Sequence, residues 1–126
     1  MARANLPDDP TFRNLAVTGE VFLGGYGTVT QITSITTGVT LSTKRGAITT
    51  FDPALAAAGE ATFTVTNTTV NLTSNVIVSV RTNVTAGGPV LAFVSAITAG
   101  TFNITLTNLH ATTQADTAMV INFVVI

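Results

Sequence analysis

The chain has 126 residues and a formal net charge of -1, with 46% hydrophobic and 9% charged residues and no cysteine. This length fits one domain, and the near-neutral charge excludes the basic surface that nucleic acid or anionic lipid would require. The lack of cysteine excludes disulfides and thiolate sites, and no apolar run approaches the roughly 20 residues of a membrane-spanning helix.

Charged residues are scarce, since ordinary domains contain about 25% of them. The mean hydropathy is +0.53. We therefore expect a surface of threonine, asparagine, serine, glycine and exposed aliphatic side chains, part of which is buried in an assembly. A secreted threonine-rich β domain is the alternative. Met1–Pro10 argues against it, because two prolines and two aspartates stand where a signal peptide has its apolar region.

The first 13 residues predict an extended arm, because they offer little to bury and contain two prolines. We expect this arm to become ordered against a partner. The remainder, residues 14–126, is predicted to form one β-sandwich domain. It begins with two short β-like runs separated by Gly19, and their apolar side chains are candidates for an assembly interface: Leu15, Val17, Val21 and Phe22.

The next segment predicts a hairpin and a short helix. After the glycine-rich turn at Gly24–Gly27, a strand over Gly38–Ser42 is expected to return through a turn at Thr43–Gly46. A helix of one or two turns is predicted over Asp52–Gly59. Asp52 would be its N-cap, a proline occupies the first helical position, and a glycine ends it.

The clearest strands lie over 61–66, 76–81 and 102–107, where apolar residues alternate with threonine or other polar residues except at Ile77. Pro89–Ala96 and Ala118–Ile126 are instead apolar on both faces. We therefore expect both to be covered on both sides, either as central strands or by a second subunit. On the second of these segments, three residues complete the candidate assembly interface: Val120, Val124 and Ile126. About eight short strands predict an all-β fold, an antiparallel β-sandwich of jelly-roll or immunoglobulin-like kind.

No catalytic, metal-binding or cofactor-binding residues can be assigned. His110 is the only histidine, and Asp116 and the serines near it lie in ordinary strand or loop contexts. Asp8 and Asp9 could hold calcium loosely, but a solvated acidic arm is the favoured interpretation. The chain has no tryptophan and one tyrosine, so it lacks the aromatic platform common in glycan sites. We expect a protein that is not an enzyme and needs no cofactor.

Four blocks resemble, in the same order, a β domain found in virion proteins of tailed bacteriophages, often at their C-termini. The blocks are Thr36–Thr50, Ala54–Asn67, Ala99–Asn108 and Val120–Ile126. Upstream, Asn14–Gly19 is similar to the Leu-x-Val-x-Gly units that link segments of trimeric phage fibres and spikes. The resemblance covers roughly residues 14 to 126, through apolar, glycine and threonine positions without a catalytic signature.

The resemblance implies a structural protein of the virion that is assembled in the bacterial host cytoplasm and forms a homotrimer. Its implied partners are other copies of itself and the major capsid protein or other virion proteins, with no nucleic acid and no membrane. The domain usually caps a longer protein, whereas here it follows a short arm. This favours decoration or cementing of the capsid over a fibre. A tail-fibre or spike module and a host-glycan-binding adhesin remain as alternatives.

Overall fold

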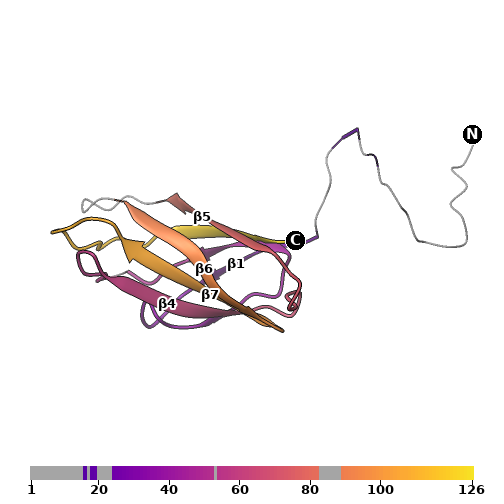
Figure 1. Cartoon of the computed structure of the whole chain (residues 1–126), viewed down its shortest axis with the longest axis horizontal. Helices are drawn as coiled ribbons and strands as arrows, with labels where there is room; N and C mark the ends of the chain where they lie inside the picture. The colour runs from indigo at the N-terminus through magenta and orange to yellow at the C-terminus, as the bar shows by residue number, and fades with distance from the viewer. Residues whose placement is uncertain (1–15, 17, 20–23, 53, 83–88) are drawn as a thin grey trace, which may run out of the picture.

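The computed structural model describes residues 16, 18–19, 24–52, 54–82 and 89–126. Within them, eight strands form two four-stranded sheets that pack face to face (Figure 1). This confirms the predicted all-β sandwich. The strands are β1 (Tyr26–Thr30), β2 (Val39–Thr40), β3 (Arg45–Thr49), β4 (Glu60–Thr66), β5 (Val76–Thr82), β6 (Val90–Thr98), β7 (Thr101–Asn108) and β8 (Val120–Val125).

Sheet A has the strand order β1-β3-β8-β5, and sheet B has the order β2-β4-β7-β6. Four of the strand pairs are antiparallel, as predicted, but β1 pairs with β3 and β2 pairs with β4 in parallel. The parallel pairs arise because the intervening strand lies in the opposite sheet. The chain therefore crosses the sandwich and returns in its original direction.

The predicted hairpin at Thr43–Gly46 is wrong, because the strands on either side of it belong to different sheets. The backbone amide of Leu41 donates to the Thr66 carbonyl at 2.9 Å, and the Asn67 side-chain amide donates to the Thr43 carbonyl at 2.8 Å. These bonds keep the residues just before the turn against sheet B. Lys44 and Arg45 are consequently half-buried at a crossover and do not form a solvated hairpin tip.

The predicted helix over Asp52–Gly59 is also wrong. Leu55 is buried in the core, and its backbone pairs with that of Ala115 through two hydrogen bonds of 3.0 and 2.9 Å. Burial of one large side chain thus outweighs a local preference that only a turn or two of helix could satisfy. No helix in the described part of the chain is long and apolar enough to cross a membrane.

Strand β8 occupies a central position in sheet A, between β3 and β5. Its inner side chains, Ile121, Phe123 and Val125, are buried, and the rings of Phe123 and Phe102 lie 5.5 Å apart across the two sheets. This confirms the core position of the terminal strand. On its outer face Val120 and Val124 are half-buried within one chain, so the covering of this face by a second subunit stays a prediction.

Buried amides hold several loops. Asn67 is fully buried, and its side-chain oxygen accepts from the Thr69 amide at 2.9 Å. Gln31 is buried where β1 ends; its side-chain amide donates to the carbonyls of Ile35 and Thr37, and its oxygen accepts from the Phe51 amide. Such satisfied groups position the backbone where regular pairing ends.

Gly46 is required by the close approach of β1 and β3. A Cβ at this position would lie 2.5 Å from the Gly27 carbonyl oxygen and 3.1 Å from the Phe123 ring. We expect Gly46→Ala to lower the free energy of unfolding by about 1–3 kcal/mol, because the backbone must shift to remove the overlap. Chemical denaturation measures the change. Gly25→Ala is the control, since no atom lies within 4 Å of its added Cβ; equal stabilities of the two variants would contradict the prediction.

Candidate interaction surfaces

The described members of the predicted assembly interface lie on the outer side of sheet A. Val120 and Val124 point outward from β8, and the Asn122 side chain stands between them. Ile126 follows the end of the strand and is 65% exposed. It lines an open apolar depression of about 470 Å³ together with Gly24, Lys44 and Val125. The other four predicted interface residues, Leu15, Val17, Val21 and Phe22, lie outside the described residues.

The outer face of sheet A is mixed in character. One row of register partners crosses this face from β1 to β5. In order, it contains Tyr26 of β1, Arg45 of β3, Val124 of β8 and Ile77 of β5. The next row in the same direction contains threonine, alanine, asparagine and serine. The apolar side chains on this face are therefore separated by polar ones.

The outer face of sheet B carries a threonine ladder, defined by Thr62, Thr64, Asn103, Thr105 and Thr107. The hydroxyls of Thr62 and Thr105 lie 2.8 Å apart, and the Thr64 hydroxyl donates to Asn103 Oδ1 at 2.9 Å. At the end of the ladder, the Thr107 hydroxyl donates to Glu60 Oε1 at 3.2 Å. The hydroxyls partly satisfy one another across strands, which gives an ordered polar face with little charge.

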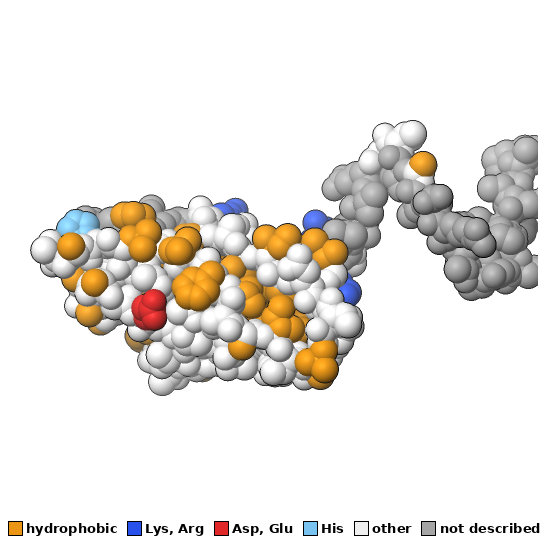
Figure 2. Space-filling model, in the orientation of Figure 1, with side chains coloured by type: hydrophobic (Ala, Val, Ile, Leu, Met, Phe, Trp, Pro, Cys, Tyr) orange, Lys and Arg blue, Asp and Glu red, His pale blue; other side chains and the backbone are white. Residues whose placement is uncertain are grey.

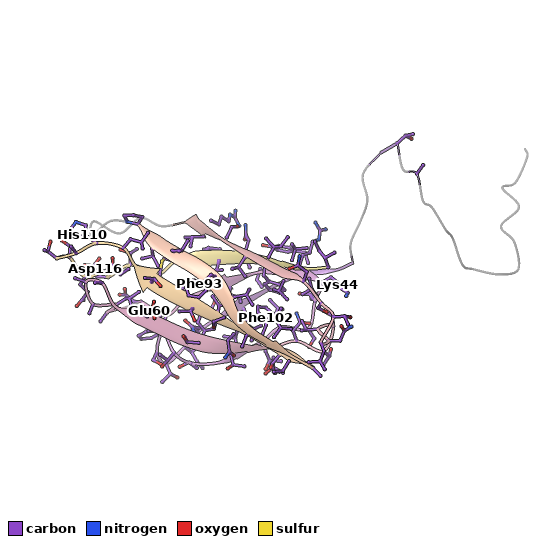
Figure 3. The ribbon with its side chains drawn as sticks, in the orientation of Figure 1. Lys44, Glu60, Phe93, Phe102, His110 and Asp116 are labelled. Atoms are coloured by element: carbon purple, nitrogen blue, oxygen red, sulfur yellow. The ribbon has the colours of Figure 1, made fainter. Side chains whose placement is uncertain are left out.

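The side of the sandwich where β5 and β6 meet is apolar. We call it the β5–β6 strip. Its half-buried members Val78, Val80, Val94 and Ile97 lie toward the space between the sheets, whereas Ile77 points outward from sheet A and Leu91 and Phe93 point outward from sheet B, in register with Thr107 and Thr105 of the threonine ladder. Leu91 is 50% exposed and Phe93 39% exposed. Figure 2 shows hydrophobic side chains gathered over β6, and Figure 3 labels Phe93 on this strand.

The strip shows that Pro89–Ala96 is not a central strand within one chain, whereas its covering by a second subunit stays a prediction. Strand β6 pairs only with β7 among the described strands, so it is an edge strand whose outward side chains remain accessible. The sequence contained a signal for this surface, because β6 is apolar on both faces and has no charged residue. A two-faced apolar pattern identifies surface that needs covering, but it does not distinguish a central strand from an edge.

His110 serves its own loop. Its Nδ1 atom accepts hydrogen bonds from the Thr112 and Thr113 amides at 3.2 and 3.0 Å, which requires the tautomer protonated at Nε2. Figure 3 shows His110 and Asp116 at the same end of the sandwich. Among the described residues, no group of three histidine, aspartate or glutamate side chains is placed to hold a metal ion.

No protein-family model matches the sequence, and neither the curated proteins nor the solved structures contain a significant match to it.

Proposed function

We propose that this protein is a non-enzymatic structural component of a tailed-bacteriophage virion, which decorates or cements the capsid exterior as a homotrimer. The proposal rests on the position of the four resembling blocks in the fold. They contain β2 and β3, β4, β7, and β8, and so include the central pairs β3–β8 and β4–β7 of both sheets. The resemblance therefore concerns the residues that build the sandwich.

The surface supports a role in assembly. It offers an apolar strip, a threonine ladder with little charge and several isolated exposed aliphatic side chains. Such surfaces associate through shape and apolar contact more than through ion pairs. The cross-strand hydroxyl bonds also hold the ladder in place before contact, which reduces the entropy lost when it binds.

The mechanism would be mechanical. A protein that contacts neighbouring capsomers adds binding free energy to the closed shell, because it binds only the assembled state. Repeated weak contacts then act together over the lattice. The partner surface would belong to the major capsid protein.

Copy number in purified phage particles tests the proposal. Decoration of the whole lattice predicts on the order of a hundred copies or more, because symmetry repeats each site over the shell. Quantitative mass spectrometry against the major capsid protein gives the count, and detached tails provide the control fraction. A count of a few tens or fewer, or recovery of the protein with the tails, would contradict decoration and favour the fibre or adhesin alternative.

A further inference from the structure

We infer that the β5–β6 strip is the surface through which copies of this chain contact one another, with the edge of β6 in one copy against the edge of β5 in the next. This assignment rests on the proposed assembly of the protein as a trimer. The inference goes beyond that proposal by naming β5 and β6 as the strands that form the contact between copies.

The first observation is that both strands end their sheets on the same side of the sandwich. β5 is the last strand of sheet A and β6 the last strand of sheet B, and the two strands contact each other. No described strand pairs with the outer edge of either. An outer edge presents unpaired backbone N–H and C=O groups, which can pair with a strand from another chain.

The second observation is that β6 has almost none of the features that normally prevent such pairing. Edge strands are usually short or carry lysine, proline or inward-pointing charges. β6 extends over nine residues without a charge. A bulge between Val94 and Ala96 is its one protective feature, and it leaves the regular segment Val90–Val94, which presents Leu91 and Phe93 outward.

The third observation is that the core is incompletely closed on this side. Val78 and Val80 of β5 and Val94 and Ile97 of β6 pack against the core but remain only partly buried. A neighbouring chain would remove this apolar surface from water, which favours association. The strip therefore offers apolar burial and backbone pairing together.

Charge and direction favour another copy of this chain as the occupant. The contact sets β6 of one copy against β5 of the next, and Arg81 is the only charged residue on the two strands, so no pair of like charges opposes it. β5 and β6 run in opposite directions (Figure 1). Rotation about an axis parallel to the strands keeps these directions, so β6 meets the next copy's β5 in antiparallel orientation and the ring can close.

Lysine substitutions on the strip test the inference. We expect the unmodified protein to have three times the 12.9 kDa chain mass in light scattering behind a sizing column. The double variant Leu91→Lys/Phe93→Lys should have the mass of one chain, and Ile77→Lys on β5 should have the same effect. All three side chains are already partly exposed, so the circular dichroism spectrum should remain that of a β protein.

Controls locate the contact. Ile32→Lys and Leu72→Lys change exposed aliphatic side chains outside the strip and should leave the trimer intact. A second comparison, Val120→Lys, charges the outer face of sheet A away from Ile77, which is in register with Val124. The inference is overturned if the unmodified protein is a monomer, if the trimer survives the β6 or the β5 substitutions, or if only the sheet A variant dissociates. A trimer that these substitutions dissociate but that is absent from phage particles would overturn the proposed function alone.

Discussion

Removal of Val120–Ile126 is expected to abolish folding of the domain. The deleted segment contributes three buried core side chains, Ile121, Phe123 and Val125, each worth roughly 1.5–3 kcal/mol of burial free energy. It also contributes the strand that pairs with both β3 and β5, so its loss divides sheet A. The total loss is comparable to the 5–15 kcal/mol that stabilises a typical domain.

Circular dichroism and thermal unfolding measure this effect. The truncated chain should lose its β-type spectrum and its cooperative transition. The matched control is Val120→Thr/Val124→Thr, which keeps β-branched residues on the half-buried outer face of the same strand. We expect the control to change the free energy of unfolding by about 1 kcal/mol or less. A truncated protein that melts cooperatively at the original temperature would show that β8 is peripheral.

Asn108→Leu is expected to destabilise the domain by roughly 2–5 kcal/mol, because it removes the partner of several buried backbone groups at once. Asn108 is 1% exposed. Its side-chain amide donates to the carbonyls of Leu55, Ala56 and Thr113 at 3.2, 3.2 and 2.9 Å, and its oxygen accepts from the His110 amide at 3.0 Å. Leucine has a similar volume but satisfies none of these groups.

Asn103→Leu is the matched control for this substitution. Asn103 lies on the same strand, points outward and accepts one side-chain hydrogen bond, from Thr64. We expect a loss of about 1 kcal/mol or less, because water can replace that bond. Urea denaturation of both variants gives the comparison. Equal losses would show that Asn108 does not organise the two loops that it joins. Hydrogen exchange provides a second measurement. The His110 amide donates to Asn108 Oδ1, and the Ala58 amide donates to the His110 carbonyl at 2.9 Å, so both should exchange faster in Asn108→Leu only.

The sequence alone predicted the strands that bury one face. In 61–66 and 102–107 apolar residues alternate with polar ones, and these segments became β4 and β7 with the apolar side inward. Alternation is informative because successive side chains of a strand point to opposite faces, so a sheet with one buried face imposes this period. The inner face of β8 was predictable for the same reason.

The candidate surface was only partly predictable. Val120, Val124 and Ile126 were identified from their apolar character, and they are half-buried or exposed in the structure. The β5–β6 strip was missed because strands β6 and β8 have the same two-faced apolar pattern, yet β8 is central and β6 is an edge. Position in a sheet depends on which distant segments pair, and a local pattern does not record that pairing.

Tertiary structure also decided the path between the strands. Turn residues at Thr43–Gly46 predicted a hairpin, but hydrogen bonds from Leu41 and Asn67 direct the chain across the sandwich. The helix signals around Asp52 were overridden by the burial of Leu55 beside Ala115. Short local preferences are worth little against a buried side chain and its backbone pairs. The sequence therefore indicated which segments form strands and which of their faces are buried. Contacts between residues far apart in the chain decided which strands lie next to one another.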